Sequence, residues 1–241
     1  MTAQITFTED QQKASEALIG FLASDDPVFV LEGYSGTGKS TLINKIINDL
    51  PTTLKTIKLI NPNAKTLDVC LTATTNKAAE NLAHITGSAA STIQSHLGLV
   101  VLTDWQTRKS SLVPRTNKKQ ANQLLFIDEA SYIDRELLKW IFTMTEDSKI
   151  VFIGDPAQLT PVKARNTPVF DAKFPTARLT QVVRQAEGNP IVSLSTKFRE
   201  TVSSGQFFSF KPDGISIKHL HKDKFEAAFI QEFTRPDWKA N

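Results

Sequence analysis

The chain has 241 residues, of which 40% are hydrophobic, so it can bury one substantial core or two small ones. Its net charge of +3 is too small to indicate a polyanionic partner by itself. The single cysteine, Cys70, excludes an intrachain disulfide and a cysteine-based zinc site. No apolar run approaches a membrane span, and the first residues are too polar for a signal peptide. We therefore expect a soluble protein of the cytoplasm, or of a host's cytoplasm if a phage encodes it.

An amphipathic helix over residues 9–23 is the first element that the sequence predicts, and an apolar strand over 28–32 follows it. Next comes the spacing Gly33-x-x-x-x-Gly38-Lys39-Ser40 of a phosphate-binding P-loop. In this motif backbone N–H groups surround phosphate oxygens, the lysine contacts the β and γ phosphates, and the hydroxyl coordinates Mg²⁺. A glycine-rich turn is the alternative interpretation, but the strand before the motif and the helical pattern after it favour a site for ATP and Mg²⁺. The predicted nucleotide ligands here are Gly33, Gly36, Thr37, Gly38, Lys39, Ser40 and Thr41.

Apolar strands alternate with helical segments through the rest of the chain. The alternation predicts an α/β fold in which helices flank a parallel sheet, a P-loop NTPase of the RecA-like kind. In such sheets, ligands bind beyond the carboxyl ends of the strands, where the polar signatures of this sequence fall. The expected strands span residues 68–74, 123–129 and 149–155, and the expected helices span 40–50, 76–85, 91–99, 134–145 and 189–200.

A basic stretch over residues 99–120 interrupts this alternation. A structureless loop of that length would be unusual, so we expect a small subdomain that projects from the sheet. A solvated loop is the alternative, because a run of like charges is often only a hydrated surface.

Two carboxylates, Asp128 and Glu129, end the apolar strand LLFIDE. Adjacent carboxylates at a strand end are costly unless a cation or hydrogen bonds compensate them. We expect Asp128 to hold Mg²⁺ and Glu129 to polarise the water that attacks the γ phosphate. The alternative is that they cap the next helix. Asp155 and Gln158 follow the next strand, where the amide of Gln158 can contact both the γ phosphate and the attacking water.

Together these motifs resemble the superfamily 1 helicases of the 5′-to-3′ branch, the RecD-like and phage Dda-like enzymes, over nearly the whole chain. FTEDQQKA is similar to the family's Q-motif, GYSGTGKST to motif I, and LTATTNKAAENL to motif Ia. STIQSHLGL is similar to motif Ib, IDEAS to motif II, GDPAQLTPV to motif III, and RLTQVVRQAEGNPIVSL to motif IV. Gln94 departs from the family, in which many members carry histidine in motif Ib.

The resemblance implies the remaining nucleotide contacts. Gln11 of the Q-motif is expected to contact the adenine, and Arg184 of motif IV is expected to reach the γ phosphate. Such an arginine stabilises charge in the transition state, although a surface salt bridge is the alternative for Arg184.

The resemblance also implies a contact with single-stranded DNA and duplex junctions. Thr74, Thr75, Asn76 and Lys77 are expected to meet backbone phosphates, with Thr92 of motif Ib as a further contact. Helix capping by Thr75 or Asn76 is an alternative that can hold at the same time.

In this branch the insertion at residues 99–120 carries a β-hairpin that helps to part the duplex. Trp105 is therefore expected to stack on a base, with Arg108 and Lys109 on phosphates. Packing of Trp105 beneath the hairpin is the alternative.

The first RecA-like domain is expected to comprise residues 1–98 and 121–241, with the hairpin subdomain at 99–120. Nothing after Arg199 resembles the motifs of a second RecA-like domain, so we expect an N-terminal fragment of a longer helicase. Such a fragment should be monomeric and hydrolyse ATP weakly or not at all, while the full-length protein moves 5′ to 3′. Two other classes remain as alternatives: a stand-alone PhoH-like ATPase, and a nucleic-acid-binding scaffold with an inactive P-loop.

Overall fold

A computed structural model describes residues 7–34, 36–60, 67–105, 108–158, 167–181 and 190–235. The chain divides into two compact units, residues 1–184 and residues 185–241. The first unit contains the sheet on which the predicted site depends.

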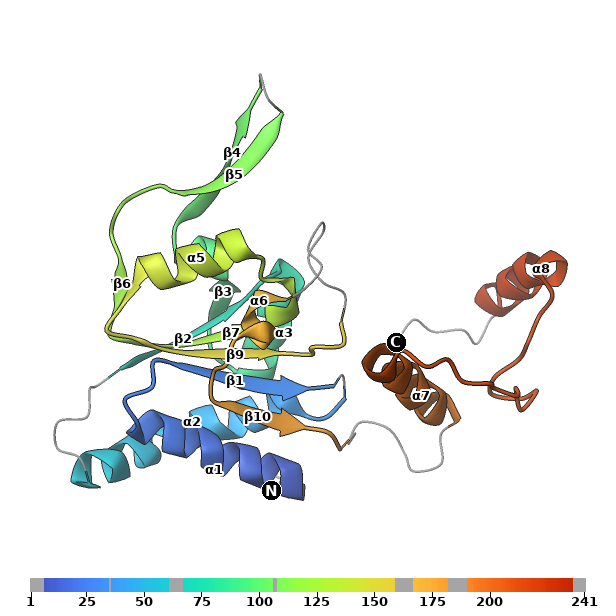
Figure 1. Ribbon diagram of the computed structural model, residues 1–241, viewed down its shortest axis with the longest axis horizontal. Coiled ribbons are helices and arrows are strands. Elements are labelled where there is room, and N and C mark those ends of the chain that lie inside the picture. The colour runs from blue at the N-terminus through green and yellow to red at the C-terminus, as the bar shows by residue number, and fades with distance from the viewer. Residues whose placement is uncertain are drawn as a thin grey trace. The chain divides into compact units, whose positions relative to one another are not determined.

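Six parallel strands form this sheet in the order β10-β1-β9-β7-β2-β3 (Figure 1). Together with the flanking helices, they confirm the predicted α/β fold. The strands are β1 (Val28–Gly33), β2 (Asp68–Ala73), β3 (Ala90–Thr92), β7 (Gln123–Asp128), β9 (Lys149–Gly154) and β10 (Thr176–Leu179).

The central strands form because their apolar runs can be buried on both faces. Leu124 and Phe126 of β7 enter one hydrophobic core, while Leu125 and Ile127 enter the other, and all four have no exposed surface. Alternation along a strand thus gives one core on each side of the sheet.

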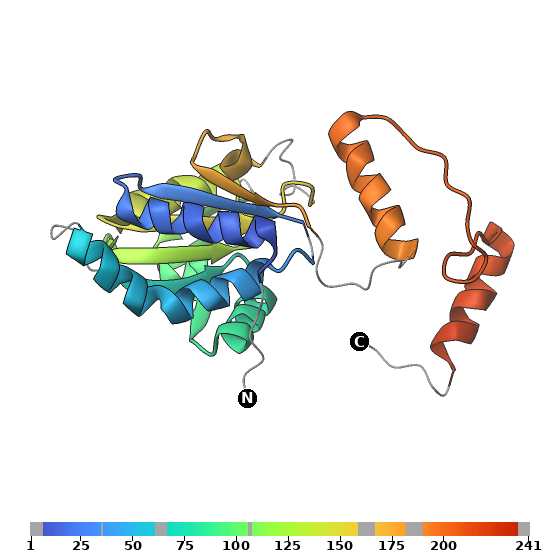
Figure 2. The same ribbon diagram turned by 90° about the horizontal axis from the view of Figure 1, so that it is seen from below.

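Helices cover both faces of the sheet. The first core lies beneath α1 (Glu9–Ala23), α2 (Lys39–Ile60) and α3 (Asn76–Thr86). Figure 2 shows α1 and α2 side by side across that face. The second core lies beneath α4 (Ile93–His96), α5 (Arg135–Met144), α6 (Pro168–Asp171) and the 3₁₀ turn η1 (Ala130–Tyr132).

Two local predictions differ from the structure. The helix expected to end at residue 50 continues through Pro51 to Ile60, and Ile57 is only 5% exposed in the first core. Burial of this apolar face compensates for the hydrogen bond that a proline removes from a helix. The helix expected over 91–99 is only α4, because Ala90–Thr92 pair with β2 as an edge strand.

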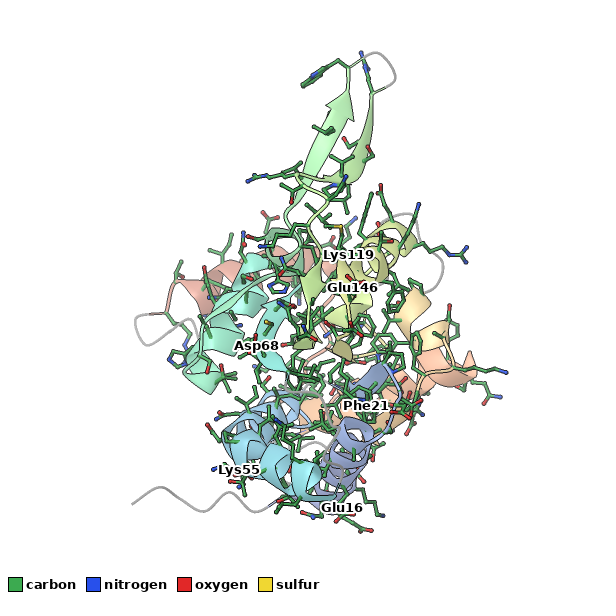
Figure 3. All side chains as sticks on the ribbon, turned by 90° about the vertical axis from the view of Figure 1, so that its left-hand side faces the viewer. Glu16, Phe21, Lys55, Asp68, Lys119 and Glu146 are labelled. Carbon is green, nitrogen blue, oxygen red and sulfur yellow. The ribbon has the colours of Figure 1, made fainter. Side chains whose placement is uncertain are left out.

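The basic insertion contains an antiparallel hairpin of β4 (Leu99–Asp104) and β5 (Lys109–Pro114), which projects beyond α5 (Figure 1). The backbone of Leu112 fastens its base: the Leu112 amide donates to Glu136, and the Trp140 indole donates to the Leu112 carbonyl at 3.0 Å. After the hairpin, β6 (Gln120–Ala121) pairs with β8 (Thr145–Glu146). Lys119 Nζ lies 3.9 Å from Glu146 beside this pair (Figure 3).

The second unit contains α7 (Pro190–Ser204) and α8 (Lys222–Phe233). On α8 the ring of Phe229 lies between those of Phe225 and Phe233, with centroid distances of 6.1 and 4.3 Å. Within the part of the chain that the structure describes, no helix has the length and apolarity needed to cross a membrane.

Lys149, the first residue of β9, binds the C-terminal end of α1 and the residues that follow it. Its ammonium donates to the carbonyls of Phe21, Ser24 and Asp26 at 3.0, 2.8 and 2.8 Å and lies 4.4 Å from the centre of the Phe21 ring. Burial lowers the pKa of Lys149, so these acceptors must compensate the desolvated charge.

We expect Lys149→Met to lower the free energy of unfolding by about 1–3 kcal/mol, because a charged donor with three acceptors is lost. Lys13→Met is the matched control, since Lys13 is exposed and only pairs with Glu9 on the surface. Denaturant unfolding of both variants measures the difference. Equal stability of the two variants would show that the contacts of Lys149 contribute nothing.

Candidate functional site

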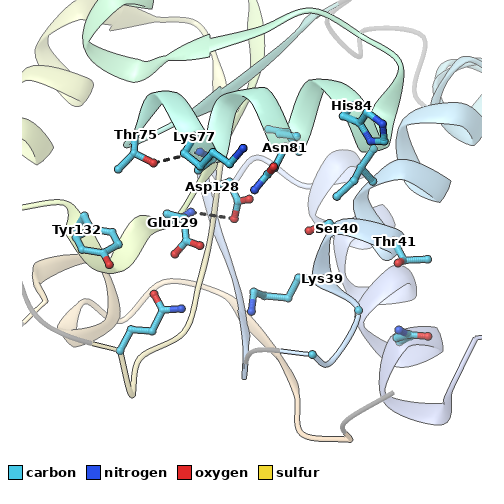
Figure 4. A pocket seen from close by; sticks show the side chains of 17 residues that line it. Lys39, Ser40, Thr41, Thr75, Lys77, Asn81, His84, Asp128, Glu129 and Tyr132 are labelled. Atoms are coloured by element: carbon cyan, nitrogen blue, oxygen red, sulfur yellow. Dashed lines mark hydrogen bonds between the residues drawn. The ribbon is translucent and has the colours of Figure 1, made fainter. Parts of the chain in front are cut away.

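A cavity of about 840 Å³ lies at the carboxyl edge of the sheet, between the P-loop, the end of β7 and helix α3. In Figure 4, Asp128 and Glu129 lie between α3 and Lys39. The structure thus brings together residues predicted from five separate motifs. Those that line the cavity are Gln11, Gly36, Gly38, Lys39, Ser40, Thr41, Thr75, Lys77, Asp128, Glu129 and Gln158.

The P-loop has the backbone that its glycines permit. Gly36 and Gly38 have φ values of 84° and 82°, a region in which other residues are strained. A side chain at Gly33 would place its Cβ 2.8 Å from the Thr37 hydroxyl, so the close approach needs glycine. Lys39 Nζ donates to the carbonyl oxygens of Gly33 and Tyr34 at 2.6 and 3.0 Å.

Gln11 joins the start of α1 to the P-loop. Its side-chain oxygen accepts the Thr8 amide in a capping box, while its amide nitrogen donates to the Thr37 carbonyl at 3.1 Å. Gln11 is 4% exposed, and a Cβ at Gly38 would lie only 2.4 Å from its nitrogen. Thr37 is buried and donates its hydroxyl to Tyr34, so its side chain supports the loop.

The acidic pair lies where negative charge is unfavourable without a cation. Burial raises the pKa of Asp128, against a hydrogen bond from the Glu129 amide and the positive charge of Lys39. Burial first, and then the charges of Asp128 and Asp155, raise the pKa of Glu129, while Lys39 lowers it. The cavity therefore favours a positive ion beside these carboxylates.

The donor set fits Mg²⁺, which the P-loop motif implies. The Ser40 hydroxyl and the Asp128 carboxylate line the same cavity. Mg²⁺ commonly takes one or two protein oxygens and completes its shell with phosphate and water, so two oxygen ligands suffice.

Gln158 is bonded to the turn that follows the acidic pair, through Ser131. The buried Ser131 hydroxyl donates to Gln158 Oε1 at 3.0 Å, which leaves the amide nitrogen of Gln158 available to the cavity. Asp155, 4% exposed, accepts the Ala157 amide at 2.9 Å and so shapes the turn that carries Gln158.

The residues predicted to contact DNA surround the start of α3 and α4. Thr75 and Thr92 cap these helices, accepting the amides of Ala78 and Ser95 at 3.2 Å each. Asn76 and Lys77 are exposed at the start of α3. Thr74 is half-buried, as Thr92 is, and it differs from the others because it donates its hydroxyl to the carbonyl of Glu129. Lys77 and Thr75 also line the phosphate cavity, which their assignment to DNA alone did not foresee.

At the hairpin tip Trp105 is 87% exposed, so it does not pack beneath the hairpin. Arg108 is exposed and has a positive φ of 54°, which turns the chain into β5. Lys109 begins β5, but its side chain lies outside the described residues, as does the whole of Arg184.

Sequence reasoning missed one wall of the cavity. Asn81, His84 and Ile85 line it together with Lys77, and Figure 4 shows three of these side chains on one face of α3. Their spacings of four, seven and eight residues from Lys77 place them on one helix face. The periodicity in the sequence shows that these residues share a helix face. Only the position of α3 in the structure shows that this face lines the cavity.

Comparison with known proteins gives a consistent set of relatives. The sequence profile of the family described as AAA domain matches residues 6–210. The ATP-dependent RecD2 DNA helicase of Deinococcus radiodurans is 34% identical over 187 residues, which are 77% of this chain and 23% of that protein. The ATP-dependent DNA helicase dda of Enterobacteria phage T4 is 31% identical over 201 residues, which are 80% of this chain and 42% of that protein.

A solved structure shares the fold. Pif1 from Bacteroides sp., in complex with ADP-AlF₄, aligns with a TM-score of 0.54 at 21% identity, over 86% of this chain and 48% of that one. The chain therefore spans less than half the length of each of these three proteins.

We expect Asp128→Asn to stabilise the nucleotide-free protein near neutral pH. The pKa of Asp128 is raised in the folded state, so its ionised form lowers the free energy of unfolding there. Asparagine keeps an oxygen that can accept the Glu129 amide, as Asp128 does at 2.8 Å. As the pH falls and the carboxyl protonates in the folded protein, the difference between variant and wild type should shrink.

Asp134→Asn is the matched control. Asp134 accepts the Leu137 amide at the same distance of 2.8 Å, but as the N-cap of a helix, where a negative charge is favourable. Denaturant unfolding should show no gain for the control. A loss of stability in Asp128→Asn at neutral pH would contradict the cost assigned to this carboxylate.

Proposed function

The chain belongs to the AAA domain family and carries a RecA-like motor domain of the superfamily 1, RecD/Pif1 type, and from this premise we propose that it binds and hydrolyses ATP as part of a DNA helicase. One observation carries the proposal. The P-loop, the Asp128–Glu129 pair and Gln158 come from the ends of three strands and line one cavity. A phosphate-binding loop opposite two carboxylates is the arrangement that phosphoryl transfer to water needs.

The P-loop supplies the phosphate contacts. Helix α2 begins at Lys39, so its positive N-terminal dipole and the adjacent amides favour the phosphate charge. Lys39 would exchange its two carbonyl acceptors for phosphate oxygens. Ser40 and Asp128 would hold Mg²⁺, which when bound neutralises charge on the β and γ phosphates.

Glu129 is positioned as the general base for water. It would accept a proton as the water oxygen bonds to the γ phosphorus and the bond to the bridging oxygen breaks, releasing ADP and phosphate. The raised pKa of Glu129 makes it a better proton acceptor than an exposed glutamate. Gln158, oriented by Ser131, would orient the water and contact the γ phosphate.

Two further nucleotide contacts follow from the family pattern. Gln11 lines the cavity, where its side chain bonds to the Thr8 amide and the Thr37 carbonyl, and the family pattern implies that it contacts the adenine. Arg184, outside the described residues, would stabilise charge on the γ phosphate.

Single-stranded DNA and duplex junctions are the proposed nucleic-acid partners. Thr75, Asn76 and Lys77 offer a hydroxyl, an amide and an ammonium at the exposed start of α3, and these groups are ordinary phosphate ligands. Thr92, at the start of α4, would add a further hydroxyl. Trp105 and Arg108 offer a stacking surface and a cation at the hairpin tip.

The wider context is proposed on the same basis. RecD2 and dda are named ATP-dependent DNA helicases, which supports a helicase as the whole protein. Its movement from 5′ to 3′ and its place in the cytoplasm are proposed from the motif resemblance alone. The boundaries of the motor domain, at residues 1–98 and 121–241, and of the inserted subdomain at 99–120 remain predictions from the sequence.

Lys39→Ala and Glu129→Gln should each lower the rate of ATP hydrolysis by at least about 100-fold, because each removes a group that stabilises or activates the reacting atoms. Single-turnover assays with protein in excess over labelled ATP, with and without single-stranded DNA, measure even slow hydrolysis. Glu129→Gln should still bind nucleotide, whereas Lys39→Ala should bind it more weakly.

Lys45→Ala is the matched control for Lys39, since Lys45 lies on the same helix but pairs with Asp49 at the surface. Its hydrolysis rate should equal that of the wild type. Wild-type hydrolysis by Glu129→Gln would exclude Glu129 as the base.

Trp105→Ala should weaken binding of a single-stranded oligonucleotide by about tenfold, the loss expected when one stacked base loses its aromatic partner. Because Trp105 is 87% exposed, the fold should not change. Fluorescence anisotropy measures the affinity, and Val101→Ala, also exposed on the hairpin, is the control. Unchanged affinity in Trp105→Ala would remove the hairpin tip from the DNA site.

A further inference from the structure

We propose that Thr74 is a positioning residue that links the DNA-contacting start of α3 to the general base Glu129, so that DNA regulates hydrolysis through this contact. The inference rests on the proposed function, since it concerns regulation of the same site. It adds a role for a side chain that sequence comparison assigned only to DNA.

The contact between Thr74 and Glu129 lies directly beyond the carboxyl ends of β2 and β7. Strands β2 and β7 run parallel, with Ala73 opposite Asp128 as the last pair of the ladder. Beyond it the Thr74 amide donates to the Asp128 carbonyl at 3.2 Å, and the Thr74 hydroxyl donates to the Glu129 carbonyl at 3.0 Å. One residue thus holds the peptide carbonyls of both members of the acidic pair.

Glu129 needs such support because its backbone is strained. It adopts φ 56° and ψ 43°, a left-handed conformation that costs a residue with a Cβ. This conformation starts η1 and sets the direction in which the carboxylate leaves the chain. The Tyr132 amide also donates to the Glu129 carbonyl at 3.1 Å, so two donors hold the turn.

The other side of the same turn is held by β9. A Cβ at Gly154 would lie 3.1 Å from the amide nitrogen of Ala130, so this strand packs closely against the turn. Ser131 is fully buried and bonds to Gln158. Thr74 is therefore the support of Glu129 on the β2 side, which is the side that continues into the DNA-contacting residues.

The hydroxyl of Thr74 has one proton, and it donates this proton in the hydrogen bond to the backbone carbonyl of Glu129. Contact with phosphate is thus left to Thr75, Asn76 and Lys77, which are exposed and follow directly in the chain. A phosphate bound there orders the backbone at Thr74, which in turn fixes the Glu129 peptide. DNA therefore favours the conformation in which Glu129 is aligned with water.

Thr74→Val tests the link, because valine keeps the shape of threonine and removes the hydroxyl. Amide hydrogen exchange over residues 129–133 should become about five- to tenfold faster, as expected for the loss of one hydrogen bond. Thr74→Ser keeps the hydroxyl and should restore slow exchange.

Thr72→Val is the matched control. The Thr72 hydroxyl donates to the Phe126 carbonyl at 2.8 Å, also from β2 to β7, but within the ladder. It should leave exchange over 129–133 at the wild-type rate. Equal effects of Thr72→Val and Thr74→Val, or no effect of either, would overturn the proposal.

Kinetics and binding test the regulatory part. In Thr74→Val, kcat for ATP should fall about tenfold with little change in KM, the Kd for an oligo-dT should stay within about twofold, and stimulation by oligo-dT should be lost. In the wild type, oligo-dT should slow exchange over 129–133, and in Thr74→Val it should not. A weaker oligo-dT affinity with unchanged kcat would instead make Thr74 a direct phosphate ligand and overturn the link.

Different results would contradict the proposed function and the proposed role of Thr74. If the wild type neither hydrolyses ATP nor binds oligo-dT, the proposed function fails for this chain. The exchange rates of Thr74→Val, Thr74→Ser and Thr72→Val still decide whether Thr74 holds Glu129, because they require no activity.

Discussion

The parallel pairing of β1, β9, β7 and β2 is the constraint on which the site depends. Hydrogen-bonded parallel strands run in one direction, so their carboxyl ends reach the same edge of the sheet. The P-loop, the acidic pair and the turn with Gln158 therefore become neighbours, although the first and last are more than a hundred residues apart. Two-sided burial of β7 protects this arrangement, because a slip of one residue would exchange the side chains of the two cores.

At that edge, residues at the ends of two neighbouring strands contact the turn that carries Glu129. Glu129 lies in a strained turn between Thr74 on one side and the tightly packed Gly154 on the other. Burial raises the pKa values of Asp128 and Glu129, and the charge of Asp128 raises that of Glu129 further. Strain and buried charge both cost stability, and such costs are common where a protein prepares a site for a ligand.

Two tryptophans show how the hairpin divides into a fixed base and an exposed tip. Trp140 on α5 donates its indole proton to Leu112 and packs on the second core, so it anchors the hairpin. Trp105 is almost fully exposed at the tip of the hairpin, directly after β4. A large aromatic side chain that is exposed to water at the end of a projecting hairpin suits contact with another flat ring. The fold thus anchors the base of the hairpin and exposes an aromatic surface at its tip.

The sequence by itself determined the P-loop, the strands with carboxylates at their ends and the α/β class, because spacing and apolar periodicity are local properties of the chain. It did not reveal the edge strand at Ala90–Thr92, the passage of α2 through Pro51, or the face of α3 that lines the cavity. Each of these depends on a partner distant in sequence: β2 for the edge strand, the first core for α2, and the P-loop for α3. The hydrogen bond from Thr74 to Glu129 joins residues 55 positions apart, and only the assembled sheet brings them within reach.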